Sequence, residues 1–109
     1  MTKTLWEVLV PRFSNEKKEF SVEHHRQWDE KVRVIAGGVT ILRTAKGHWV
    51  NPEGKAFVEE MIPVRVYCTE EQVENIMDYT LVHYSQKAVF AYEVSTRVKI
   101  RPDSFNPTE

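Results

Sequence analysis

Cysteine, glycine, excess charge and long apolar runs are all scarce in this sequence of 109 residues. The single cysteine, Cys68, excludes an internal disulfide and a zinc site made of several cysteines, and we expect it to be a small buried side chain. The four glycines form no phosphate-binding loop. No window is long and apolar enough to span a membrane, and the first residues, MTKTLWEV, lack a signal-peptide core. We therefore expect a cytosolic protein without a cofactor.

The charges nearly cancel, with 15 Lys and Arg against 16 Asp and Glu and a net charge of −1. Such a balance gives no long-range attraction for nucleic acid or an anionic membrane, so we expect neither as a partner. No nucleophile elbow and no cysteine with a placed histidine partner is present, so we assign no catalytic residue. Apolar content of 41% suits one ordinary folded domain.

Hydrophobic periodicity predicts four strands and two helices. Alternation predicts strands over residues 4–11, 38–44, 59–68 and 88–100, and spacings of three or four predict helices over 22–36 and 70–85. Ser21 and Gly37 are the expected N-cap and stop of the first helix. Thr69 and Gln72 form a capping box for the second. Pro63 predicts a bulge, or a strand position whose missing N–H faces no partner.

The resulting order, β-α-β-β-α-β, predicts an α+β ferredoxin-like fold: an antiparallel sheet with two helices on one face. We expect this domain over residues 1–100 and a C-terminal tail over 101–109. The helix-free face of the sheet would carry apolar Leu5, Leu9 and Met61. Because such faces are commonly covered by a second copy, we expect a homo-oligomer, with a trimer favoured over a dimer.

The stretch KGHWVNPEGK, residues 46–55, lies between two apolar runs. Lys46 and Gly47 can turn the chain, and NPEG has the proline and glycine positions of a type I turn. Two turns would leave His48 and Trp49 on a short strand or arm. The alternative is a loop whose His48 and Trp49 contact a ligand or partner.

The central segment, GGVTILRTAKGHWVNPEGKAFVEE, carries a recognisable pattern: Gly-(Leu/Val)-Thr-(Val/Ile)-Leu, then Gly-x-Trp-x-(Asp/Asn)-Pro-x-Gly, then a glutamate. This pattern resembles a bacterial family known only as a domain of unknown function, and the resemblance implies no activity. In architecture the chain is similar to the trimeric PII-like and CutA-like proteins. That similarity implies ligand or partner contacts in the segment between the second and third strands.

Charged side chains on the sheet supply the main site candidates. If the four predicted strands lie in the order 4-1-3-2, then Glu7, Arg65 and Glu93 project from the helix-free face. Charges there must be paired or face a cavity, so the trio forms either a structural ion-pair set or a pocket for a small polar ligand. Tyr67 and Tyr92 are candidate rims, although Tyr92 lies on an apolar stripe and is expected in the core.

The histidines do not form a metal motif. His24 and His25 are adjacent on a helix, so their side chains point about 100° apart, whereas a helical metal pair is spaced by four. His48 and His83 have no second ligand at metal spacing, and we assign no metal. A site assembled from histidines of several subunits stays open.

Two functions follow from these features. The first is a non-enzymatic, homo-oligomeric module that binds a small ligand or protein partner through the arm around His48 and Trp49 and the adjoining sheet face. The second is a cofactor-independent enzyme of the dimeric α/β-barrel kind, in which Glu7, Arg65 or His83 transfers a proton.

Overall fold

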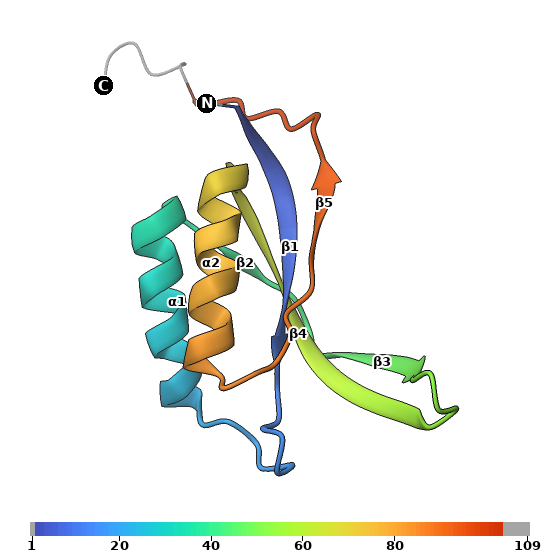
Figure 1. The fold of residues 1–109 in the computed structure, drawn as a ribbon. Coiled ribbons are helices and arrows are strands. Elements are labelled where there is room, and N and C mark those ends of the chain that lie inside the picture. Colours follow the sequence, from blue (N-terminus) through green and yellow to red (C-terminus); the bar gives the residue numbers. More distant parts are fainter. Residues whose placement is uncertain (1, 104–109) are drawn as a thin grey trace.

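The computed structural model describes residues 2–103, apart from the side chain of Trp49. Two helices lie side by side on one face of a single antiparallel sheet, and a long hairpin extends beyond them (Figure 1). The elements are β1 (Lys3–Pro11), α1 (Val22–Ala36), β2 (Thr40–Ile41), β3 (Ala45–Val50), β4 (Ala56–Thr69), α2 (Glu70–His83) and β5 (Ala91–Ser95).

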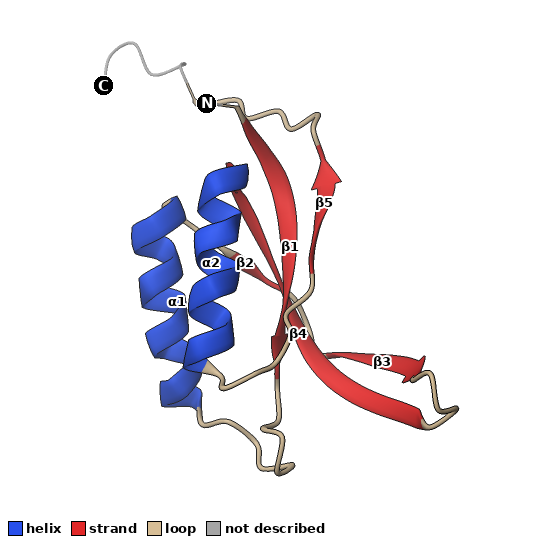
Figure 2. Cartoon of the chain, in the orientation of Figure 1, coloured by secondary structure: helices blue, strands red, loops and turns tan. Residues whose placement is uncertain are grey.

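The strands lie in the order β2-β4-β1-β5, and β3 pairs with the other half of β4. This confirms the α+β ferredoxin-like fold and the strand order expected from the sequence. Both helices cover the same side of the sheet, which leaves the opposite side without helices (Figure 2). We call that opposite side the open face. It is the surface on which Glu7 and Arg65 lie.

Pro63 explains why the strand predicted over residues 38–44 is shortened to the two residues of β2. The β2–β4 ladder pairs Thr40 with Arg65 and Ile41 with Val64, so the next pair would be Leu42 with Pro63. The Leu42 N–H donates to the Pro63 carbonyl at 2.9 Å. The return bond cannot form because proline has no N–H. The ladder therefore stops, and pairing resumes only at Ala45, where β3 begins.

One of the two turns expected in residues 46–55 is present. The Gly54 N–H donates to the Asn51 carbonyl at 2.9 Å, and Gly54 has the left-handed φ of +83° that favours glycine. The turn expected at Lys46 and Gly47 is wrong, because both residues lie inside β3. Gly47 is instead a point of close approach, since a Cβ there would lie 2.7 Å from the Met61 methyl group.

The helix ends follow the sequence signals. The Ser21 hydroxyl accepts a hydrogen bond from the His24 N–H, and Gly37 ends α1 with a φ of +90°. At the start of α2, the Thr69 and Gln72 side chains each accept from the other residue's backbone N–H, at 3.1 and 2.9 Å. Both expected N-caps are thereby confirmed.

The core lies between the helices and the sheet. Its most buried members are apolar residues from β1, β4 and both helices: Val8, Val10, Trp28, Val32, Val64, Val66, Cys68, Val73, Ile76 and Tyr84. Cys68 is fully buried as expected, and burial raises the pKa of its thiol. A buried polar contact joins the two helices, where the Trp28 indole N–H donates to the Thr80 hydroxyl at 2.8 Å.

The last strand is shorter than the alternation predicted. β5 ends at Ser95, which pairs with Leu5, and β1 begins only two residues earlier, at Lys3. Residues beyond Ser95 therefore have almost no strand left to pair with. The Ser95 hydroxyl accepts from the Arg97 N–H at 3.0 Å, which turns the chain there. Of the expected tail, residues 104–109 lie outside the described part of the chain.

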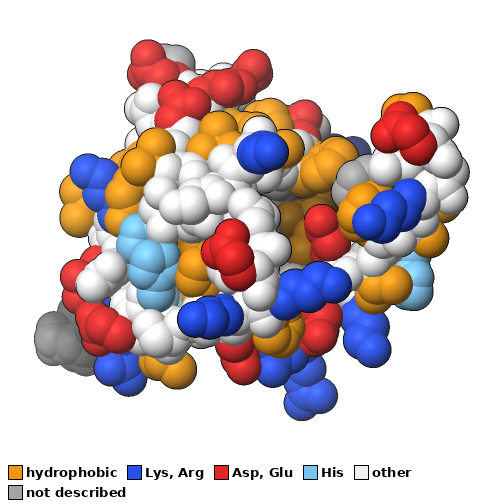
Figure 3. Space-filling model, turned by 60° about the horizontal axis from the view of Figure 1, so that its bottom comes forward, with side chains coloured by type: hydrophobic (Ala, Val, Ile, Leu, Met, Phe, Trp, Pro, Cys, Tyr) orange, Lys and Arg blue, Asp and Glu red, His pale blue; other side chains and the backbone are white. Residues whose placement is uncertain are grey.

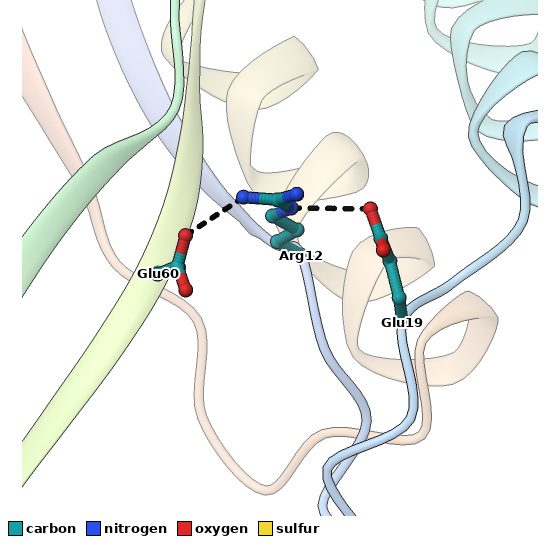
Figure 4. A network of polar contacts seen from close by, with 3 residues as sticks. All are labelled: Arg12, Glu19 and Glu60. Atoms are coloured by element: carbon teal, nitrogen blue, oxygen red, sulfur yellow. Dashed lines mark hydrogen bonds and ion pairs between the residues drawn. The ribbon is translucent and has the colours of Figure 1, made fainter.

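An ionic network joins the body to the base of the hairpin. Arg12 lies just after β1 and donates to Glu19 at 3.1 Å and to Glu60 at 2.8 Å (Figure 4). The hydrogen bond to Glu19 is the main reason that the pKa of Arg12 is raised. Glu60 lies on β4 opposite Lys46, so the network holds the 12–19 segment against the hairpin where it leaves the sheet.

Candidate functional site

Three strands bring a carboxylate, a guanidinium and a phenol together on the open face. Glu7 of β1 lies directly opposite Arg65 of β4 and Tyr92 of β5 in the strand register. Arg65 Nε donates to Glu7 Oε1 at 3.0 Å, and the Tyr92 hydroxyl donates to Glu7 Oε2. Each carboxylate oxygen therefore has its own donor. We call these three residues the open-face triad.

The three members differ strongly in burial. The Glu7 side chain is 7% exposed, whereas the Arg65 side chain is 40% exposed and Tyr92 is 46% exposed. A buried carboxylate needs such partners, because an unpaired charge at that depth would be strongly destabilising. The hydrogen bond with Glu7 is the main reason that the pKa of the Tyr92 phenol is raised. The triad thus presents a phenol and a guanidinium edge to the outside.

The sequence placed Glu93 in this group, and that placement is wrong. Glu93 pairs with Trp6, whose side chain packs on the helix side, so Glu93 points away from Glu7. Tyr92 takes the expected place, and the core position predicted for it is also wrong. Alternation shows which side chains share a face but does not say which face packs on the helices. On β5 the helix-side residue that packs against the core is Ala91.

The hairpin candidates lie far from the triad. His48 is exposed and lies opposite Val58, seven residues along β4 from Arg65, which is about 23 Å at the usual strand rise. The Trp49 side chain lies outside the described part of the structure. His48 and Trp49 therefore do not form one site with Glu7 and Arg65 within a single chain, and a role for them in binding stays a prediction.

A small cavity lies where the hairpin leaves the open face. It has a volume of about 60 Å³ and is bordered by Leu9, Met61 and Phe90, among others. In the space-filling view, hydrophobic side chains line the hollow between the hairpin and the body, and charges of both signs surround it (Figure 3). A volume of 60 Å³ holds about two waters, so the cavity is too small for an organic ligand.

Three histidines meet between the helices, which the sequence analysis missed. His24 and His83 stack with ring centroids 3.9 Å apart, and each Nε2 donates to the other residue's backbone carbonyl at 2.7 Å. His25 Nδ1 lies 2.7 Å from the buried Tyr84 hydroxyl. Burial, together with the two neighbouring histidines, lowers the pKa of His25. The available signal was positional: His24 lies in the first turn of α1 and His83 in the last turn of α2.

The histidine cluster lies on the helical layer, so the sheet separates it from the open-face triad. The enzymatic hypothesis grouped His83 with Glu7 and Arg65, and the structure shows that His83 is not part of that group. Among residues 2–103, no three His, Cys, Asp or Glu side chains are arranged to hold a metal ion. No helix in the same range is long and apolar enough to cross a membrane.

Comparison of sequences gives no relative. No protein-family model matches the chain, and no curated protein is similar enough to count as a match. The resemblance of the central motif to a family of unknown function therefore stays a prediction.

Comparison of structures gives clear matches. A periplasmic divalent cation tolerance protein, CutA, from Archaeoglobus fulgidus superposes with a TM-score of 0.66 and 14% identity, covering 92% of this chain and 89% of that one. The divalent cation tolerance protein CutA1 from Thermus thermophilus gives 0.63 and 11%, covering 86% and 84%. A phage SAM lyase in complex with S-methyl-5'-thioadenosine gives 0.61 and 11%, covering 95% and 93%. The chain has a CutA-like ferredoxin-like architecture. Because the identities are this low, the matches define the fold and not the chemistry.

Proposed function

We propose that the protein is a homo-oligomeric module that binds a small polar ligand on its open face. The observation that supports this most is the open-face triad: Glu7 is 7% exposed on a face without helices, and its two partners reach the surface. A buried ion pair adds little net stability compared with apolar residues of similar size. A charged group at such a place is therefore better explained by a role in ligand binding than by a role in stability.

Self-association is part of the proposal. The open face also carries apolar Leu5, Leu9 and Met61, as expected, and Phe90 and Tyr92 of the β5 region are 72% and 46% exposed. Exposed aromatic residues beside partly buried aliphatic ones are typical of surfaces that a second copy covers. The trimer favoured from the sequence is retained in the proposal, and so is a cytosolic location.

Native mass spectrometry of the protein purified from its own source tests both parts. The proposal expects a defined oligomer and a retained small molecule. Glu7→Gln removes the charge but keeps the side-chain shape, so the variant should assemble normally and lose the ligand. Glu30→Gln, on the exposed side of α1, is the matched control for a change of one charge. A monomer, or a ligand retained equally by Glu7→Gln, would contradict the proposal.

An enzymatic function is the second candidate. The Tyr92 hydroxyl donates directly to the Glu7 carboxylate, an arrangement in which a proton can pass between them during a reaction. A protein with the same fold is a phage SAM lyase that holds S-methyl-5'-thioadenosine. Incubation with SAM, followed by chromatography for S-methyl-5'-thioadenosine, tests this directly. Formation that is lost in Tyr92→Phe would establish an enzyme; no formation leaves the binding function.

A further inference from the structure

A groove of about 460 Å³ lies on the open face beside the triad. This volume is within the range of pockets that bind small organic molecules. The side chains of β1 and β4 lie on one side of the groove, and the segment from the end of α1 into β2 lies on the other. The bordering residues are Lys3, Leu5, Ala36, Gly37, Gly38, Val39, Thr40, Arg65 and Tyr67.

The charges along this groove have one sign. Among residues 2–103, Lys3 and Arg65 are the only ionisable groups that border it apart from the phenol of Tyr67, and no carboxylate of that range borders it. The Lys3 ammonium lies 5.9 Å from the centroid of the Tyr67 ring. Because Arg65 pairs with Glu7, the two cationic residues are four positions apart along β1, which is roughly 13 Å between backbone positions. The stretch between them contains Leu5 and Tyr67.

Arg65 is held in an orientation that suits anion binding. Its Nε is bound to the buried Glu7 carboxylate at 3.0 Å. Within residues 2–103, its two terminal nitrogens have no hydrogen-bond or ion-pair partner. A guanidinium held through Nε still presents two parallel N–H donors, which match a carboxylate or a phosphate. Thr40, directly opposite Arg65 in the β2–β4 ladder, brings a hydroxyl to the same end of the groove.

The opposite wall leaves space and offers little repulsion. No atom lies within 4 Å of a Cβ placed on Gly37 or Gly38, so the loop leaves room for a ligand. A helix C-terminus carries partial negative charge, which disfavours anions. Here two of those carbonyls are already occupied: Gly37 N–H donates to Arg33 at 2.8 Å, and Gln72 Nε2 donates to Ile35 at 3.0 Å.

We propose that this groove binds a small organic anion, whose carboxylate or phosphate group lies on the terminal nitrogens of Arg65, within reach of Lys3. The carbon skeleton or ring of the ligand packs on Leu5 and Tyr67. This assignment rests on the proposed binding function and specifies the chemistry of its ligand. Glu7 then acts as a positioning residue, because it orients Arg65 without touching the anion.

Calorimetric titration of the full-length oligomer at low salt tests the assignment. Citrate is the carboxylate probe, AMP is the phosphate probe, and choline is the cationic control. Lys3→Gln changes an exposed residue and should leave the fold intact. Arg65→Lys keeps the positive charge but removes the planar fork. Lys31→Gln, exposed on the helical layer, is the control for loss of one charge.

Citrate or AMP should bind, and the stronger of the two identifies whether the group recognised is a carboxylate or a phosphate. Lys3→Gln and Arg65→Lys should each weaken that binding about tenfold, the usual effect of losing one charged hydrogen bond at a partly exposed site. Lys31→Gln should change it less than twofold.

The assignment is overturned if neither anion binds, if choline binds equally well, or if Lys31→Gln weakens binding as much as Lys3→Gln. In each of these cases, native mass spectrometry separates the two proposals. If the wild-type protein retains a small molecule that Glu7→Gln loses, only the anion assignment has failed. If the native protein also retains no ligand, the proposed binding function fails with it.

Discussion

The difference in exposure within the open-face triad predicts an asymmetry between two substitutions of the same ion pair. Glu7→Met removes the buried partner, and Arg65→Met removes the exposed one. The Glu7 side chain is 7% exposed and the Arg65 side chain is 40% exposed. After Glu7→Met, the guanidinium can turn to water and methionine fills the buried position. After Arg65→Met, the carboxylate stays buried with Tyr92 as its remaining donor.

The expected magnitudes follow from these two environments. An ion pair with one solvated partner contributes up to about 1 kcal/mol, so Glu7→Met should lower the free energy of unfolding by about that amount or less. Removing the counter-ion of a fully buried charge lowers the free energy of unfolding by about 3 kcal/mol or more. Because the Tyr92 hydroxyl still donates to Glu7, we expect about 2 to 3 kcal/mol for Arg65→Met. The difference of about 2 kcal/mol is large enough to measure.

Urea unfolding at pH 7, followed by circular dichroism, measures both values. The variants must first be shown by native mass spectrometry to have the wild-type subunit number, because the stability of an oligomer depends on its assembly. The double variant isolates the coupling between the two residues. If Glu7→Met is as destabilising as Arg65→Met, or more so, the reasoning from exposure is refuted and the pair is needed for stability.

Three further outcomes can be measured on the same protein. Thr80→Val leaves the buried Trp28 N–H without its acceptor and should lower the free energy of unfolding by about 1 to 3 kcal/mol. Made in a Trp28→Phe variant, which has no such N–H, the same Thr80→Val substitution should not cause this loss. Burial lowers the pKa of His25 below its ordinary 6.5, so on acidification the unfolded chain binds the proton before the folded chain does. The free energy of unfolding should therefore fall as the pH drops below 6.5, and it should fall less steeply in His25→Asn. Urea unfolding from pH 5 to 7.5 measures both. Gly54→Ala should cost about 1 kcal/mol because of its positive φ, whereas Gly38→Ala, equally uncrowded, should be near neutral in thermal unfolding.

Local signals account for the parts of the fold that the sequence predicted correctly. The caps at Ser21 and Thr69 are formed by side chains that bond to the backbone three residues away, so they depend on local sequence alone. The strand order follows from the succession of elements, since few topologies allow two helices on one face. Pro63 was recognised as a disruption of its strand. The early end of β2 could not be predicted, because the sequence does not show which neighbouring strand faces the missing N–H of Pro63.

The candidate site was predicted only in part, because it depends on pairing between strands. Glu7 and Arg65 were placed together correctly, since strand order and alternation suffice for two central strands. Tyr92 and Glu93 were exchanged because the large apolar Tyr92 lies on the open face of the edge strand β5, whereas its helix-side neighbour in the core is the small Ala91. The pairing register also shifts between Leu5 and Trp6, which no alternation pattern reveals.

The histidine contact lay beyond sequence reasoning for a different reason. His24 and His83 are 59 positions apart, and their stacking depends on how far one helix slides along the other. Periodicity gives the face of a helix but not its axial position against a neighbour.

The division of the molecule into two faces links the stability experiment to the function. The helical face contains the apolar core, with Val8, Val64 and Val66 nearly or fully excluded from water. One residue before Val8 on the same strand, Glu7 is buried to a similar degree but carries a charge. If the fold needed only a filled position there, an apolar residue would serve as well or better. A small effect of Glu7→Met on unfolding, together with loss of the ligand, would therefore assign the carboxylate to the orientation of Arg65 rather than to the stability of the sheet.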